Sequence, residues 1–151
     1  MAFLAFSEFK DGAVSSTSTK SGIALINEQE VQKSVSRAKS QADLVVVSYH
    51  FGDEYELAHN DFQQKYAELA VNAGADLVVG AHPHVVENPL RYKNAWVAYS
   101  LGNFIFDQPF SRETMQGGLL EAEVNPNTKL IEKVTLKKVF LNKTYQVENI
   151  E

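Results

Sequence analysis

Residues 42–50 read ADLVVVSYH, and residues 75–84 repeat the pattern as ADLVVGAHPH. Each stretch is a continuous apolar run, which is typical of a β-strand covered on both faces. Between them, residues 60–74 place their apolar side chains on one helical face, with Asn60 as a candidate N-cap and Gly74 where a helix ends. Strand, helix and strand at this spacing predict a βαβ unit with two parallel neighbouring strands and a right-handed crossover.

The rest of the chain extends this unit at both ends. Residues 2–6 predict an earlier strand, and an amphipathic helix follows a candidate N-cap at Asn27. The later stretches AWVAYS, NFIFD, GGLLEAEV and LIEKVTLKKVFL predict strands without helices between them, and NPNT at 125–128 predicts a hairpin turn. We therefore predict an α/β fold in a single domain over residues 1–151, in which a βαβαβ half is followed by antiparallel strands.

Composition excludes several classes of protein. The chain has 151 residues, a net charge of −5 and no cysteine. The acidic balance and the lack of a basic stripe argue against a nucleic-acid partner, and the lack of cysteine excludes disulfides and cysteine-based zinc sites. The apolar run at the N-terminus is too short for a signal peptide or a membrane span. We expect no export signal or anchor in these residues, and if the parent protein is exported, that information lies elsewhere.

Histidines end both strands of the repeated unit. His50 closes the first strand, and His82 and His84 flank Pro83 after the second. Ligands of parallel α/β sheets bind beyond the carboxyl ends of the strands, so we expect the three imidazoles to share one site. The proline should hold His82 extended, which would point His82 and His84 to the same side, and Gly80 would let the backbone pass close to a bound group. Three imidazoles suit a zinc-like ion, whereas the alternative is ordinary loop and packing histidines.

Further candidates follow these strands. Glu54, just after His50, could ligate a metal, orient a histidine, act as a general acid or base, or favour the next helix N-terminus. Asn103, in the Gly-Asn turn of YSLGNFIFDQ, could present its amide to a phosphate or a metal-bound water, or only form a turn. Asp107 could accept a hydrogen bond behind a ligand. We expect His59, at the start of a helix, to lie on the surface.

Three motifs together resemble one family. The stretches VVVSYHFGDEYE, AGADLVVGAHPHVVE and VAYSLGNFIFDQ, in that order and spacing, closely resemble the bacterial capsule synthesis protein CapA/PgsA family. That family is associated with poly-γ-glutamate capsule biosynthesis and belongs to the calcineurin-like metallophosphoesterase superfamily. The resemblance runs along essentially the whole chain and covers the C-terminal part of a family member. It implies the C-terminal half of a metallophosphoesterase-like α/β/β/α sandwich.

The resemblance also implies roles for individual residues. His82 and His84 match the His-x-His that ligates a two-metal site, and His50 matches the histidine at the preceding strand end. His84, Glu54 and Asn103 would then be the catalytic residues. The implied cofactors are divalent metal ions of the manganese, zinc or iron class, and the implied reaction is hydrolysis of a phosphoester or a related centre.

The same resemblance implies that the site is incomplete in this chain. The superfamily takes its other ligands from an N-terminal half, with an early Asp, a Gly-Asp pair and an Asn-His motif, and none of these stands ahead of the first strand here. We therefore expect a fragment of a larger domain, inactive alone, from a parent protein at the outer face of the cell membrane or outside the cell. Expected partners are the missing N-terminal half, capsule synthase membrane subunits and, for the isolated chain, further copies of itself. The alternative is a non-catalytic polymer-handling or assembly module of a membrane-bound capsule synthase complex.

Overall fold

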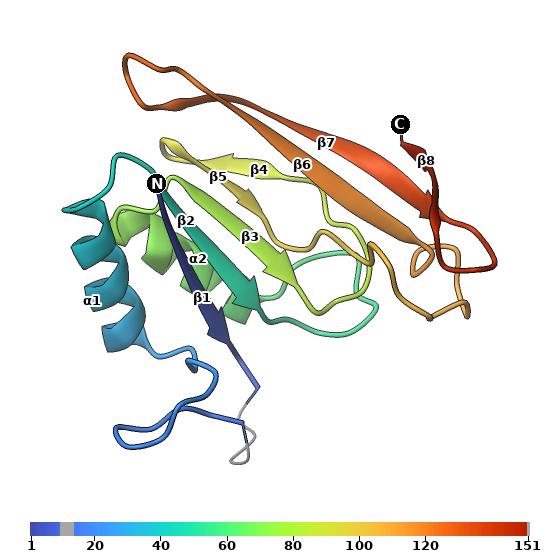
Figure 1. Cartoon of the computed structure of the whole chain (residues 1–151), viewed down its shortest axis with the longest axis horizontal. Helices are drawn as coiled ribbons and strands as arrows, with labels where there is room; N and C mark the ends of the chain where they lie inside the picture. The colour runs from blue at the N-terminus through green and yellow to red at the C-terminus, as the bar shows by residue number, and fades with distance from the viewer. Residues whose placement is uncertain (10–13, 151) are drawn as a thin grey trace.

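A computed structural model describes residues 1–9 and 14–150 (Figure 1). These residues form two helices and eight strands. In chain order the elements are β1 (Ala2–Ser7), α1 (Glu28–Lys39), β2 (Val45–His50), α2 (Asp61–Ala73), β3 (Leu77–Ala81), β4 (Leu90–Tyr92), β5 (Ala95–Ala98), β6 (Gln116–Val124), β7 (Ile131–Leu141) and β8 (Val147–Ile150).

The strands form two sheets. The first has five strands in the order β1-β2-β3-β5-β4, with β1, β2, β3 and β5 parallel and β4 antiparallel to β5. The second is the antiparallel sheet β6-β7-β8. The parallel pairing of β2 and β3 around α2 confirms the βαβ unit, and the turn between β6 and β7 confirms the hairpin. The fold is therefore α/β, as the sequence predicts.

Both helices begin at the N-caps that the sequence indicates, and α2 also ends at the predicted glycine. The Asn27 side chain accepts hydrogen bonds from the backbone amides of Gln29 and Glu30 and so caps α1. Asn60 and Gln63 form a reciprocal capping box at the start of α2. Gly74 ends α2 in the left-handed conformation, with φ of 114°, which glycine adopts without a steric penalty. Neither helix has the length and apolar character needed to cross a bilayer.

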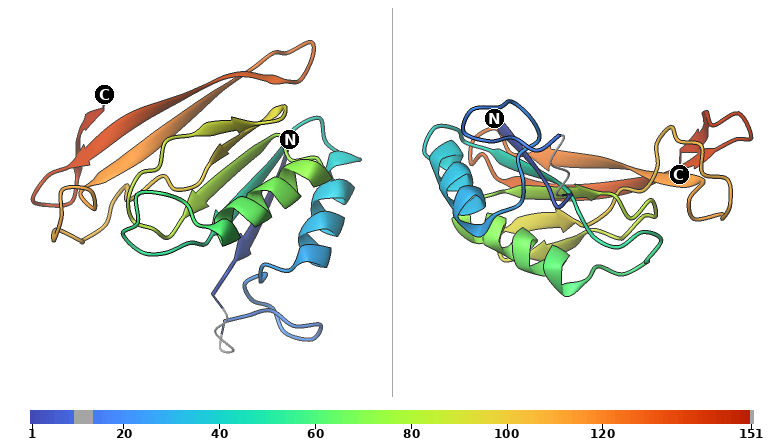
Figure 2. Two further views of the ribbon diagram at one scale, coloured as in Figure 1. Left: turned by 180° about the vertical axis from the view of Figure 1, so that it is seen from behind. Right: turned by 90° about the horizontal axis from the view of Figure 1, so that it is seen from below.

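The elements stack in three layers. Helices α1 and α2 cover one face of the five-stranded sheet, and the β6–β7 hairpin crosses the other face (Figures 1 and 2). The helix side holds the larger core cluster, in which fully buried Val31 and Val35 of α1 meet Val45 and Val47 of β2. Each such valine contributes about 1.5–3 kcal/mol when it leaves water. A smaller cluster around Leu44, Val46, Leu77 and Ile131 joins the two sheets.

The structure corrects the expectation of a strand at NFIFD, residues 103–107. These residues form a loop, and Phe104, Ile105 and Phe106 are exposed. The loop follows two isolated bridges, of Leu101 to Val86 and of Gly102 to Gly117. The Asn103 amide still hydrogen-bonds to Gln116 of β6, and residues 104–107 form no bridge to any strand of the described chain. An apolar run therefore predicts a strand only where a neighbouring strand is available to pair with it.

Gly80 has a different role from the one expected. A Cβ atom at this position would lie 1.8 Å from the backbone oxygen of Tyr99 and 2.7 Å from the ring of Phe51. The Gly80 carbonyl also accepts a hydrogen bond from the Leu101 amide. Gly80 thus admits a neighbouring segment of its own chain, rather than a bound ligand.

The two edges of the five-stranded sheet differ in how they are protected. Strand β4 is three residues long and carries the exposed Arg91, whereas β1 (AFLAFS) has no charge or proline and Phe3 is 72% exposed. Within the described residues the backbone of β1 pairs only with β2 and with Leu44 just before it, except at Ser7, which also bridges to Leu25. An open apolar edge of this kind is a template for another strand.

We predict that the isolated chain self-associates through β1. Phe3→Lys should weaken the association by about tenfold, or about 1.4 kcal/mol, because it places a charge on the open edge. Leu130→Lys, at an exposed position near the β6–β7 turn, is the matched control and should leave association unchanged. Light scattering over a range of concentrations measures the effect, and a monomer at high concentration would refute the prediction.

Candidate metal centre

The three histidines expected at the strand ends lie at one edge of the five-stranded sheet. The register of β2 and β3 pairs His50 with Ala81, so the residue after β3, His82, follows directly beside the end of β2. The ring centroids of His50 and His82 are 5.0 Å apart, and those of His82 and His84 are 5.8 Å apart. The parallel pairing therefore gathers three imidazoles from two segments far apart in sequence.

The backbone that presents His82 and His84 differs from the extended conformation expected. His82 has φ of 110° and His84 has φ of 60°, so the His-Pro-His segment (residues 82–84) is a bend. The amide of Tyr55, itself at φ of 68°, donates a 2.8 Å hydrogen bond to the carbonyl of Pro83. This tertiary hydrogen bond helps to hold a turn that the local preference of a pre-proline residue does not predict. Such backbone costs about 1–3 kcal/mol per residue and persists only where the surroundings enforce it.

Glu54 joins two of the histidines. It lies on the segment between β2 and α2, the Glu54 loop (residues 51–60), which the Tyr55–Pro83 hydrogen bond ties to the His-Pro-His segment. Ligand atoms of Glu54, His82 and His84 all lie within 4.8 Å of one another. Two imidazole nitrogens and a carboxylate oxygen are a donor set suited to zinc, manganese or iron, so the residues present fit a divalent metal. His50 is outside this group of three and contacts it through the ring of His82.

Asn103 sets the orientation and protonation of His84. Asn103 Oδ1 lies 2.9 Å from His84 Nδ1, and Asn103 Nδ2 donates to the carbonyl of Thr114 at 2.9 Å. A carbonyl only accepts, so the Thr114 contact identifies the amide nitrogen and leaves Oδ1 facing the imidazole. Oδ1 can only accept in turn, so Nδ1 of neutral His84 carries the proton. Nε2 is thereby left with a free lone pair, as a metal ligand requires.

The amide of Asn103 is otherwise fully engaged. Asn103 is 5% exposed, and its Nδ2 also donates to Gln108 Oε1 at 3.1 Å. The geometry thus makes Asn103 a residue that acts through His84, and direct contact with a phosphate stays a prediction. Asp107 is exposed, and it is the neighbouring Gln108 that hydrogen-bonds to Asn103.

Aromatic rings pack against each of the three histidines. Phe9 contacts His82 edge to face at 4.4 Å between centroids and His50 at 5.3 Å. Tyr55 and Phe106 both stack with His84, at 6.0 Å and 5.2 Å. The imidazole rings are therefore restrained by packing as well as by hydrogen bonds.

The electrostatics of the site favour neutral histidines. Burial lowers the pKa of His50 below its ordinary value of 6.5, and the neighbouring His82 and His84 lower it further. Burial also lowers the pKa of His82, although the carboxylate of Glu54 opposes this change. A metal ligand must be deprotonated, so these lowered pKa values keep both imidazoles competent to bind at neutral pH.

Sequence reasoning missed a buried polar group behind the site. Glu87 is only 5% exposed, and its Oε2 lies 3.7 Å from Nδ1 of His59. The prediction that His59 lies on the surface holds only in part, because its ring stacks on buried Tyr99 at 3.8 Å and its side chain is 30% exposed. Tyr99 is remote in sequence, and no local pattern around His59 reveals that contact. A glutamate between Val86 and Asn88 likewise carries no burial signal of its own.

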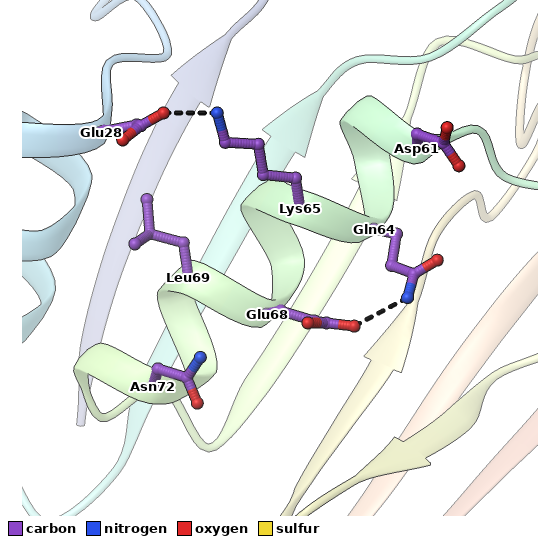
Figure 3. A pocket seen from close by; sticks show the side chains of 7 residues that line it. All are labelled: Glu28, Asp61, Gln64, Lys65, Glu68, Leu69 and Asn72. Atoms are coloured by element: carbon purple, nitrogen blue, oxygen red, sulfur yellow. Dashed lines mark hydrogen bonds and ion pairs between the residues drawn. The ribbon is translucent and has the colours of Figure 1, made fainter.

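Two surface pockets help to locate the functional edge of the molecule. A pocket of about 540 Å³ lies beside the histidines and is formed in part by Glu8, Phe9 and His82. Another pocket, of about 440 Å³, lies on α2 and is formed without any histidine (Figure 3). Four of its polar side chains pair with one another, Lys65 with Glu28 and Gln64 with Glu68. We assign the second pocket to a solvated helix surface and the first to the candidate metal centre.

Similarity to known proteins identifies the family of the chain. The family model described as bacterial capsule synthesis protein PGA_cap matches residues 1–108, which include every residue of the candidate centre. The chain is 38% identical over 142 residues to the capsule biosynthesis protein CapA of Bacillus anthracis, covering 90% of this chain and 34% of that protein. It is 44% identical over 93 residues to the PGA biosynthesis protein CapA of Bacillus subtilis (strain 168), covering 62% of this chain and 24% of that protein.

The extent of these matches defines what the chain shares with its relatives. It spans about a third of the length of the first protein and about a quarter of the second. The family match covers more than half of this chain and includes both parallel strands that end in histidine. The chain therefore belongs to the bacterial capsule synthesis protein family.

Proposed function

We propose that this chain forms the histidine side of a divalent-metal centre in a protein of poly-γ-glutamate capsule biosynthesis. The observation that carries the proposal is the convergence of Glu54, His82 and His84 within 4.8 Å at the carboxyl edge of the sheet. The name of the B. subtilis relative, a PGA biosynthesis protein, supports the choice of polymer. The reaction class is a metal-dependent hydrolysis of the phosphoesterase type.

Each residue of the centre has a stated task. His82 and His84 would hold the ion through ring nitrogens and Glu54 through a carboxylate oxygen, and Asn103 holds His84 as the tautomer with Nε2 free. A divalent ion in this position supplies Lewis-acid polarisation of a phosphoryl or carbonyl oxygen. The pocket beside His82 gives a substrate a place next to the ligands.

We further propose that a longer polypeptide completes the centre. Two-metal hydrolases use ligands on both sides of the reacting group, and three ligands suffice for one ion only. The relatives are about three to four times as long as the matched region, and the open edge of β1 offers a surface for additional chain. In the complete protein, the centre would work at the outer face of the cell envelope together with membrane subunits of a capsule synthase.

A non-catalytic role in polymer handling or assembly is the second candidate. It is favoured by exposed aromatic side chains beside the candidate centre. Tyr55 and Phe106 stack with His84, Phe110 packs against Tyr55, and all three are exposed. Such a rim suits contact with another protein of the assembly.

Metal binding tests the proposed centre directly. We predict that the chain binds Zn²⁺ by titration calorimetry, and that His82→Ala combined with His84→Ala abolishes binding. Glu54→Gln should weaken binding by about tenfold or more, because the amide is a poorer ligand than the carboxylate. Glu56→Gln changes an exposed carboxylate of the same loop and is the matched control, which should bind as the unmodified chain does.

The pH dependence follows from the lowered pKa values of His50 and His82. Between the unfolded pKa of 6.5 and the lower folded pKa, the unfolded state holds more protons than the folded state. The free energy of unfolding should therefore fall as the pH drops below 6.5, and Zn²⁺ affinity should fall over the same window. Binding that is unaffected by acid, or that survives the double histidine change, would place the metal elsewhere.

Activity tests the proposal that the centre is completed by additional chain. We predict that the isolated chain hydrolyses p-nitrophenyl phosphate at or near the uncatalysed rate with Zn²⁺ or Mn²⁺ present. The complete protein should be active, and its equivalents of His82→Ala and His84→Ala should lose most of that activity. Strong metal-dependent hydrolysis by the isolated chain, abolished by His84→Ala, would show instead that the ligands described here suffice.

A further inference from the structure

A buried polar cluster joins the Glu54 loop to the His-Pro-His segment at a distance from the ligands themselves. Its members are Glu87, Gln63 and His59, of which Glu87 is 5% and Gln63 is 1% exposed. Glu87 follows the His-Pro-His segment, His59 closes the Glu54 loop, and Gln63 lies in the first turn of α2. The cluster thus connects the two segments that carry the ligands.

The Glu87 carboxylate has contacts on both sides of this junction. Burial raises the pKa of Glu87 above its ordinary value, and the side chain of Gln63 and the backbone of His59 partly oppose this change. Nδ1 of His59 lies 3.7 Å from Glu87 Oε2. Through its own amide, Glu87 donates a 3.0 Å hydrogen bond to the carbonyl of Ser100. Glu87 is therefore fixed to the sheet and in turn fixes the end of the Glu54 loop.

Gln63 extends the connection to the beginning of the same loop. Its Oε1 accepts a hydrogen bond from the Asn60 amide, and its side chain fills the space in which a Cβ of Gly52 would lie, 2.5 Å from Gln63 Cδ. Within the described chain, Gln63 Nε2 and Glu87 Oε1 have no hydrogen-bond partner of standard geometry. A buried polar atom without a hydrogen-bond partner costs stability, so the placement of each of these two atoms calls for an explanation.

Burial of the Glu87 carboxylate costs desolvation free energy, and Glu87 belongs to neither hydrophobic core cluster. An apolar side chain at position 87 would avoid the desolvation cost of the carboxyl group. A direct contact, the 2.8 Å hydrogen bond from Tyr55 to Pro83, already ties the two segments near the ligands. The Glu87 cluster adds a second contact at the other end of the Glu54 loop. Two separated contacts restrict the rotation of the loop as well as its distance from the His-Pro-His segment.

We propose that Glu87 is a positioning residue, which holds the Glu54 loop against the His-Pro-His segment and so sets the spacing between Glu54 and the histidines. The role rests on the metal centre proposed above. It operates through the contact of the Glu87 carboxylate with the His59 ring, while the hydrogen bond from the Glu87 amide to Ser100 anchors position 87. A glutamine at position 87 keeps the shape of the side chain and an accepting oxygen, whereas an alanine removes both.

The test compares Glu87→Ala and Glu87→Gln in the 151-residue chain. Glu87→Ala should weaken Zn²⁺ binding in calorimetry by about tenfold, the lower end of the effect of losing a supporting contact. It should also speed hydrogen exchange of the Tyr55 amide by about tenfold without metal, because local opening of the loop becomes easier. Glu87→Gln should restore both quantities to within about threefold of the unmodified chain.

Val35→Ala is the control for a general loss of stability. It opens a cavity under α1, remote from both segments, and should lower the melting temperature while leaving Zn²⁺ affinity and Tyr55 exchange unchanged. The proposal is overturned if Glu87→Ala behaves like Val35→Ala, or if Glu87→Gln is as damaging as Glu87→Ala. If the unmodified chain binds no Zn²⁺, the metal centre fails, and Tyr55 exchange alone decides whether Glu87 positions the loop.

Discussion

The parallel pairing of β2 with β3 is the constraint on which the rest of the structure depends. Its register sets His50 beside Ala81 and so delivers His82 and His84 to the same edge. The apolar runs of the two strands make this register stable, since a shift by one residue would turn their buried side chains to the opposite faces. Helix α2 returns the chain between the strands, and its cap at Asn60 marks where the Glu54 loop ends.

Around this edge, strained backbone and incompletely paired polar groups lower the stability of the fold, and burial of the hydrophobic core offsets this loss. Tyr55, His82 and His84 all have positive φ, and Glu87 and Gln63 are buried polar groups that are not fully satisfied. Strained backbone and buried polar side chains gather where a defined arrangement of groups is needed. The contacts from Asn103 to His84 and from Tyr55 to Pro83 explain why these groups are kept. Both contacts fix segments that carry the proposed metal ligands.

Local patterns in the sequence predicted the parts of the fold that local physics determines. The parallel strand pair, the helix caps at Asn27 and Asn60 and the β6–β7 turn follow from apolar periodicity and side-chain chemistry, and the structure confirms them. The gathering of the histidines followed from the strand order alone. The bend at His82 and the stacking of His59 on Tyr99 depend on contacts between distant segments, which no local pattern encodes.

X-ray absorption at the zinc edge tests most directly whether these strand ends form a metal centre. With one equivalent of Zn²⁺, the account predicts a first shell of nitrogen and oxygen at about 2.0–2.2 Å, with the multiple-scattering signal of two imidazoles. That signal should vanish in the chain carrying both His82→Ala and His84→Ala. A spectrum without imidazole scattering, or one that the double change leaves intact, would contradict the account.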